Sequence, residues 1–91
     1  MMTATIYGEK ITDRAALHAA LADALTLPEY YGANLDALHD CLTSISTPTV
    51  LQIVDFPALE QNLGVYAQRF IHVVFDAAQE NPNFTVECIT E

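Results

Sequence analysis

The stretch Leu27–Thr43 reads LPEYYGANLDALHDCLT and is the most informative part of the chain. Its first half contains Pro28 and Gly32, two residues that are typical of a loop. Asn34 is a good helix N-cap, because its side-chain oxygen can accept a hydrogen bond from a backbone N–H of the first turn. The sequence therefore predicts a loop that leads into a short helix, which Asn34 caps and which ends near Thr43.

The predicted helix has two different faces. At about 100° per residue, its apolar side chains gather on the side that we expect to face the sheet, namely Leu35, Leu38, Cys41 and Leu42. The opposite side carries Asp36, His39, Asp40 and Thr43. Asp36 and Asp40 lie one turn apart, and like charges at this spacing destabilise a helix by about 0.2–0.5 kcal/mol. The chain has only three Lys or Arg residues and none lies in this stretch, so the acidic pair indicates a cationic partner.

The flanking sequence predicts the rest of the fold. Residues 3–7 and 84–89 have the composition of short strands, and residues 50–54 form a nearly continuous apolar run, typical of a strand covered on both faces. Apolar residues recur at helical spacing over 13–25 and 65–80, and a short helical turn follows Asp55 and ends near Gly64. Each connection between strands is long enough for a right-handed crossover. We therefore expect an α/β fold in one domain, residues 1–91, with a small three-stranded parallel sheet and about four helices packed against it.

Composition limits the classes of partner. The chain of 91 residues has twelve Asp or Glu and a formal net charge of -9, yet 52% of it is hydrophobic. Nucleic acids and anionic membranes require basic patches, so we expect no direct binding to either. The sequence shows no signal-peptide pattern and no apolar run of membrane-spanning length, and we expect a cytoplasmic protein that is monomeric when free. Cys41 and Cys88 lie in apolar stretches, which favours buried free thiols and a reducing compartment.

The stretch Leu27–Thr43 closely resembles the central motif of the barstar family, the intracellular inhibitors of barnase-type ribonucleases. The pattern LPEYYGxNLDALxDCLT stays in register without a gap. Weaker similarity continues over residues 6–11, at residues 17–18 and from residue 74 into the last strand. The fold that this resemblance implies, a small parallel sheet with helices, agrees with the fold predicted above.

The resemblance implies a stoichiometric inhibitor, with no catalytic residues and no cofactor. In the family, the helix and its preceding loop plug the active-site cleft of a basic ribonuclease in a one-to-one complex. Asp40 is then expected to mimic a substrate phosphate and to hydrogen-bond to the Arg cluster and the catalytic His of the enzyme. Asp36 is expected to meet a basic group at the cleft wall, and Tyr30 to pack against that His. The implied partner-binding residues are Tyr30, Asn34, Leu35, Asp36, His39, Asp40, Thr43 and Ser44.

Several positions depart from the family pattern. His39 stands where the best-known member has a Trp, which removes a large apolar contact and adds a pH-sensitive group. Ser44 replaces the usual Gly, so that a helix exit at positive φ becomes more costly. A contact Glu of the family aligns with Ala77, and the nearest acidic residue, Asp76, points about 100° away from it. These departures concern the identity of the target and leave the acidic helix itself intact.

Three other interpretations stay open at this point. A barstar-like binding module retargeted to another toxin or to a non-nuclease protein would account for the departures. A divalent-metal site could use Asp36, His39 and Asp40, with Glu29 as a fourth ligand. An enzyme could use Asp36 and Asp40 as acid and base, although this requires a cleft and one raised pKa that an exposed helix face does not supply.

Overall fold

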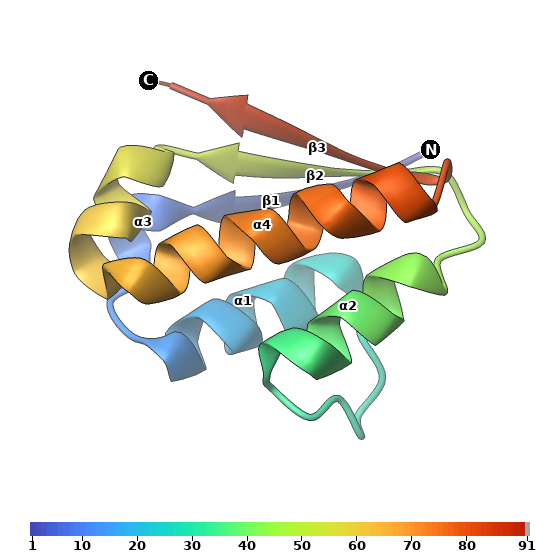
Figure 1. Cartoon of the computed structure of the whole chain (residues 1–91), viewed down its shortest axis with the longest axis horizontal. Helices are drawn as coiled ribbons and strands as arrows, with labels where there is room; N and C mark the ends of the chain where they lie inside the picture. Colours follow the sequence, from blue (N-terminus) through green and yellow to red (C-terminus); the bar gives the residue numbers. More distant parts are fainter. Residues whose placement is uncertain (91) are drawn as a thin grey trace.

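One three-stranded parallel sheet forms the centre of the protein, as the sequence predicts. The computed structural model describes residues 1–90 and places the strands in the order β1 (Met2–Tyr7), β2 (Thr49–Val54) and β3 (Phe84–Ile89). The strands are in register, so that Ile6 lies beside Ile53 and Ile53 beside Cys88. Spatial order therefore equals chain order, and each pair of neighbouring strands is joined by one helical crossover (Figure 1).

The helices lie in the two crossovers. The first contains a 3-10 turn, η1 (Gly8–Lys10), and the helices α1 (Arg14–Leu25) and α2 (Leu35–Thr43), while the second contains α3 (Phe56–Leu63) and α4 (Val65–Glu80). The expected helix over 13–25 begins one residue later, because Asp13 is its N-cap and accepts a hydrogen bond from the Ala16 amide at 2.7 Å. Asp55 caps α3 in the same way, through the Ala58 amide. A short acidic or amide side chain therefore starts α1, α2 and α3 alike.

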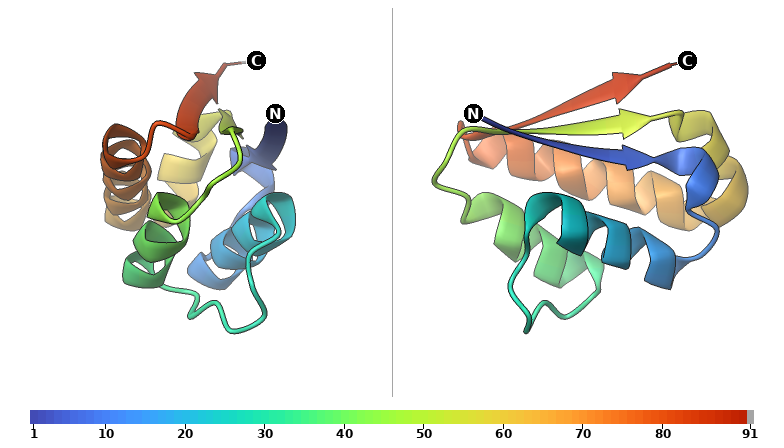
Figure 2. Two further views of the ribbon diagram at one scale, coloured as in Figure 1. Left: turned by 90° about the vertical axis from the view of Figure 1, so that its right-hand side faces the viewer. Right: turned by 180° about the vertical axis from the view of Figure 1, so that it is seen from behind.

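The helices α1, α2 and α4 lie on one side of the sheet, and α3 lies at the end where β1 and β2 finish (Figures 1 and 2). Both crossovers proceed in the same direction across the sheet. Crossovers between parallel strands are almost always right-handed, and two right-handed crossovers in the same direction place their helices on the same side of the sheet. Within residues 1–90, no helix covers the opposite face of the sheet (Figure 2).

The middle strand β2 is therefore not covered on both faces, contrary to the expectation from its apolar run. Leu51 and Ile53 are fully buried under the helices, but Val50 and Gln52 alternate with them and are only half-buried. On the open face, Gln52 accepts a hydrogen bond from the Thr5 hydroxyl and donates one to the Glu87 carboxylate. This polar row replaces the second layer of helices that a continuous apolar strand usually indicates.

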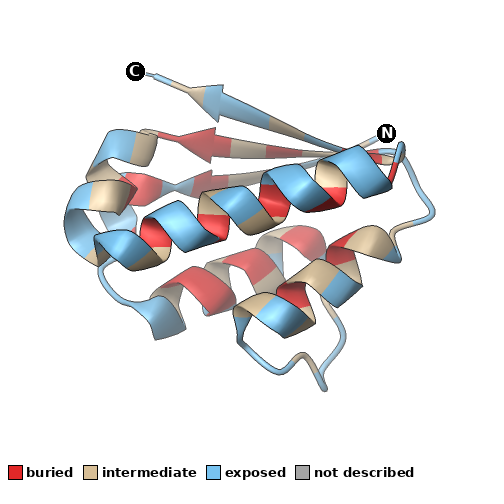
Figure 3. Ribbon diagram, in the orientation of Figure 1, coloured by how far each residue is buried: buried red, intermediate tan, exposed pale blue. Residues whose placement is uncertain are grey.

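The helix α2 packs mainly on α4 and forms the outer layer of the molecule, so the prediction that its apolar face meets the sheet is wrong (Figures 1 and 2). Its apolar face is oriented as predicted, with Leu38 and Leu42 fully buried and Leu35 and Cys41 half-buried. Figure 3 shows the buried residues of the helices turned towards the interior of the molecule. Periodicity identifies the buried face of a helix but does not identify the element that covers it.

Both cysteines are free thiols, but Cys88 is exposed on the edge strand β3, and the expectation that it lies in the core is wrong. An edge strand has one neighbour, and this leaves part of its side-chain surface uncovered. Among the described residues, no helix combines the length and the apolar character needed to cross a membrane.

Candidate partner-binding surface

The start of α2 is fixed by Asn34, as the sequence predicts. The Asn34 side-chain oxygen accepts a hydrogen bond from the Ala37 amide at 2.8 Å, and its side-chain nitrogen donates to the Gly32 carbonyl at 3.2 Å. One exposed amide thus joins the last turn of the loop to the first turn of the helix. Because the loop and α2 are joined here, side chains on the loop keep a defined position relative to those on α2.

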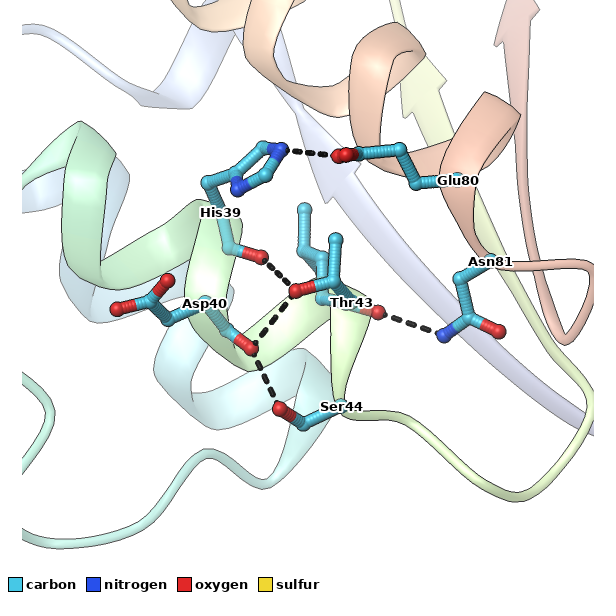
Figure 4. Close-up of polar contacts among 7 residues, drawn as sticks. His39, Asp40, Thr43, Ser44, Glu80 and Asn81 are labelled. Carbon is cyan, nitrogen blue, oxygen red and sulfur yellow. Dashed lines mark hydrogen bonds and ion pairs between the residues drawn. The ribbon is translucent and has the colours of Figure 1, made fainter.

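Asp36 and Asp40 are both exposed on the outer side of α2. The structure gives neither carboxylate a hydrogen-bond or ion-pair partner within residues 1–90, and Figure 4 shows the Asp40 carboxylate pointing away from its labelled neighbours. Asp36 is in the first turn, where the helix dipole favours a negative charge. Asp40 lies a full turn further along, where this effect fades, and its charge has no evident structural use.

Tyr30 is 88% exposed and lies at the outer edge of the loop that precedes α2. The loop folds back through a hydrogen bond of 2.9 Å from the Tyr31 amide to the Pro28 carbonyl. Tyr30 and Asp40 border the same hollow of about 340 Å³, whose other walls include Leu27, Pro28 and Ile45. An exposed tyrosine and an aspartate with an unpaired carboxylate therefore border one hollow, and aromatic anchors are characteristic of protein interfaces.

The end of α2 is organised by hydroxyl groups. The Thr43 hydroxyl lies 2.9 Å from the His39 carbonyl and 3.2 Å from the Asp40 carbonyl, and the Ser44 hydroxyl donates to the Asp40 carbonyl at 2.8 Å (Figure 4). Ser44 has φ -96°, so the helix leaves without the positive φ that a Gly at this position would permit. The departure at Ser44 thus introduces no backbone strain at the end of the helix.

Asn81, which follows α4, supports the same helix end. Its buried side chain donates to the carbonyls of Leu42 and Ile45, both at 2.9 Å. The sequence gives no local signal for this contact, because the two partners lie 39 and 36 residues away along the chain.

His39 lies on the outer side of α2, as its place in the sequence predicts, but it is only half-buried and contacts α4. Its Nε2 lies 2.7 Å from the carboxylate of Glu80 on α4 (Figure 4). His39 and Glu80 line a hollow of about 360 Å³ together with Asp76 and Gln79. The acidic surface therefore continues from α2 onto α4, through residues that sequence reasoning did not assign to the site.

Ala77, which aligns with a contact Glu of the family, is fully buried. It cannot reach a partner from this position, whereas its neighbour Asp76 is exposed. The exposed acidic residues of this part of α4 are Asp76 and Glu80.

The metal-site interpretation finds no support in this arrangement. Among residues 1–90, no group of three or more His, Cys, Asp or Glu side chains is placed to hold a metal ion. His39 is turned towards Glu80 and thus away from a shared site with the two aspartates of α2.

Cys41 is a half-buried thiol on the inner side of α2. Burial raises its pKa, and the negative charge of the adjacent Asp40 raises that pKa further. A thiol in such surroundings is a poor nucleophile at neutral pH. The surface thus offers charges for recognition and no activated nucleophile at this position.

The eight residues of the implied partner-binding set come from one continuous segment, residues 30–44, which comprises the end of the loop, α2 and its C-cap. Tyr30, Asn34, Asp36, Asp40 and Ser44 are exposed, and Leu35, His39 and Thr43 are half-buried.

The chain is similar in sequence to known proteins. The sequence model of the family described as "Barstar (barnase inhibitor)" matches residues 1–89. The chain belongs to the barstar family. A protein of Bacillus subtilis (strain 168) named "Putative ribonuclease inhibitor YrdF" is 40% identical to it over 76 residues, which cover 82% of this chain and 84% of that protein. In this barstar-family chain, the family motif coincides with the loop and acidic helix described above.

Proposed function

We propose that this protein is a stoichiometric inhibitor of a barnase-type ribonuclease and that it acts by binding rather than by catalysis. The observation that supports the proposal is the pair of exposed carboxylates on α2, Asp36 and Asp40, which lack a cationic partner within residues 1–90. Membership of the barstar family and similarity to a protein named as a ribonuclease inhibitor favour the same function.

The proposed mechanism uses Asp40 as a phosphate mimic. A ribonuclease of this type binds the phosphate of its substrate with cationic side chains, and a carboxylate in that pocket forms short, charge-assisted hydrogen bonds with them. Asp36 binds a neighbouring basic group at the wall of the cleft. Tyr30 packs its exposed ring against the catalytic His of the enzyme, and the complex contains one molecule of each protein.

The flanking residues complete the interface. Asn34 and Thr43 supply polar contacts at the two ends of α2, Leu35 supplies an apolar contact at the rim, and His39 and Ser44 border Asp40 on either side. The formal net charge of -9 favours fast association with a basic enzyme, since complementary fields raise association rates by roughly 10- to 1000-fold. Such an inhibitor protects the RNA of the producing cell when it acts in the cytoplasm.

The test is calorimetric titration of the protein into barnase, with RNA cleavage measured in parallel. We expect one-to-one binding that abolishes cleavage and weakens with added salt, because counterions screen the complementary charges. Binding without loss of cleavage would contradict active-site plugging. If cleavage were retained and no heat of binding were measured, barnase would not be a target of this protein.

A second candidate function is binding to a different basic protein through the same surface. The contact of His39 with Glu80 and the burial of Ala77 favour it, because both change the border of the surface relative to the family pattern. The two candidates differ in a competition experiment. If the second candidate is correct, a different basic protein binds the wild type but not Asp40→Ala. Barnase, which then has no affinity for the surface, does not displace that protein.

A further inference from the structure

The loop between α1 and α2 has a strained backbone at both of its ends. Thr26 and Ala33 each have φ 53°, in the left-handed region, and neither is glycine. This conformation costs roughly 1–2 kcal/mol for a residue with a side chain, and it persists only where the surrounding structure holds it. The exposed ring of Tyr30 lies between these two positions. The loop that presents Tyr30 therefore needs an anchor elsewhere in the molecule.

The anchor is Tyr31, the next residue. Its hydroxyl lies 2.5 Å from Nδ1 of His18, a residue of α1 that is only 3% exposed. The other ring nitrogen of His18, Nε2, lies 2.7 Å from the hydroxyl of Tyr66 in the first turn of α4. One imidazole thus joins the loop, α1 and α4.

The three side chains satisfy one another. A neutral imidazole has one N–H donor and one bare nitrogen, so one tyrosine hydroxyl accepts from His18 while the other donates to it. Burial raises the pKa of Tyr31, with the nearby Cys41 and Tyr66 adding to the effect, so its hydroxyl keeps its proton. Within residues 1–90, no buried side-chain nitrogen or oxygen lacks a hydrogen-bond partner. Loss of either hydroxyl would leave a buried ring nitrogen of His18 unpaired, which is costly.

Tyr66 is itself held in place from outside. The guanidinium of Arg14 lies 4.4 Å from the centre of its ring, a cation–π contact between α1 and α4. Both residues border a hollow of about 500 Å³ that reaches His18. The hollow is open to solvent, so we expect water to replace the Tyr66 hydroxyl in a variant that lacks it, and His18 then to lose its fixed orientation while the fold is kept.

We propose that Tyr66, acting through His18 and Tyr31, is a positioning residue for the partner-binding loop. It holds residues 26–34 in the strained shape that presents Tyr30, although it lies on α4 and outside the acidic surface. The consequence for binding rests on the proposed function, whereas the ordering of the loop does not.

The first test uses the free protein. Tyr66→Phe removes one oxygen and keeps the ring on which Arg14 stacks, and Tyr7→Phe on the exposed face of β1 is the matched control. We expect amide hydrogen exchange in residues 29–34 to be about fivefold faster in Tyr66→Phe, in keeping with the loss of one hydrogen bond, and unchanged in the control. Tyr31→Phe should give the same acceleration, and the double variant should give less than the product of the two. Unchanged exchange in Tyr66→Phe would overturn the inference.

A spectroscopic signature separates positioning from general destabilisation. We expect the ¹⁵N shifts of the His18 ring to show one fixed tautomer in the wild type and a mixture of tautomers in Tyr66→Phe. A destabilised variant with unchanged ring shifts would contradict the proposed route through His18.

The second test measures binding to barnase. We expect Tyr66→Phe to weaken binding about fivefold in the wild-type background and to have no effect in a Tyr30→Ala background, where the loop has no ring to present. An equal loss in both backgrounds would overturn the route through Tyr30. A wild-type protein that does not bind barnase would contradict the proposed function alone, and the exchange rates would still decide the inference.

Discussion

The Nε2 atom of His39 on α2 and a carboxylate oxygen of Glu80 on α4 lie 2.7 Å apart, and this contact joins the outer helix to the helix that supports it. The side chains are 35% and 60% exposed, so solvent screens the interaction and limits its contribution to stability to roughly 0–1 kcal/mol. Its position matters more than its strength. It holds the imidazole of His39 against α4 and so limits the contact of the ring with solvent.

A double-mutant cycle should measure how much the contact between His39 and Glu80 contributes to the stability of the fold. We expect His39→Gln and Glu80→Gln to change the free energy of unfolding by less than about 1 kcal/mol each, with a small coupling between them, because the pair is exposed. Urea denaturation measures these values. A coupling of several kcal/mol would contradict a surface contact. In a binding assay, the same variants test whether His39 and Glu80 affect the affinity for the partner.

Removal of the Asp40 carboxylate should weaken binding more than any other single change in the surface. We expect Asp40→Ala to weaken binding to a barnase-type ribonuclease by about 30-fold or more, as loss of a desolvated charge pair typically costs about 2–5 kcal/mol. Asp36→Ala and Tyr30→Ala should cost less. The matched control is Asp23→Ala, which removes an equally exposed carboxylate from α1. Isothermal titration gives the affinities, and a loss within about threefold in Asp40→Ala would contradict the phosphate-mimic role.

The same variant should leave the fold intact. Asp40→Ala removes the like-charge neighbour of Asp36, and we expect the free energy of unfolding to stay the same or rise by about 0.2–0.5 kcal/mol. A large loss of stability would show that the carboxylate has a structural role that the contacts do not reveal.

His18 should make stability depend on pH. Burial lowers the pKa of His18 below 6.5, so the folded protein binds a proton there less readily than the unfolded chain. As the pH falls through about 6.5, the unfolded state takes up this proton first, and the free energy of unfolding decreases by at most about 1.4 kcal/mol per pH unit. Above that pH the imidazole is neutral in both states and contributes no slope. The groups that face it are the hydroxyls of Tyr31 and Tyr66, with Arg14 stacked beyond Tyr66.

The comparison variant is His18→Gln, whose amide supplies one hydrogen-bond donor group and one acceptor but does not titrate. Urea denaturation between pH 7.5 and about 5 should show a smaller loss of stability in His18→Gln than in the wild type. His72→Gln, at an exposed position of α4, should follow the wild type. Parallel curves for His18→Gln and the wild type would contradict the prediction.

Thr26 offers a site for stabilisation. It ends α1 in the left-handed conformation, which is unfavourable for a β-branched residue and accessible to glycine. We expect Thr26→Gly to raise the free energy of unfolding by about 0.5–1 kcal/mol, once the greater entropy of glycine in the unfolded chain is subtracted. Thr26→Ala keeps a Cβ and should gain less. Equal effects of the two variants in urea denaturation would contradict the backbone explanation.

Local sequence determines α2 and its cap at the observed bounds. The cap of Asn34, the apolar spacing of Leu38 and Leu42 and the polar exit at Thr43 all act within a few residues of one another, and their consequences can therefore be predicted. The order of strands and helices follows from the same kind of signal. The position of Asp36 and Asp40 on one exposed face also follows from helical periodicity alone.

Contacts between distant segments could not be predicted in this way. The hydrogen bonds of His18 reach residues 13 and 48 positions away, and those of Asn81 reach α2 from the far end of α4. The apolar pattern of β2 indicates burial but not the number of layers, so the open face of the sheet at Gln52 was not foreseen. The exposure of Cys88 likewise depends on β3 being an edge strand, which is a property of the whole sheet.

The packing of α2 on α4 sets the order in which the surface can form during synthesis. The segment that carries Tyr30, Asp36 and Asp40 is complete by residue 43, and the two strands that bracket it are complete by residue 54. The residues that support this segment, Tyr66, Glu80 and Asn81, emerge from the ribosome only later. A nascent chain therefore displays the whole motif before it has the structure that holds the motif in place. On the proposed function, inhibition therefore begins only with finished chains.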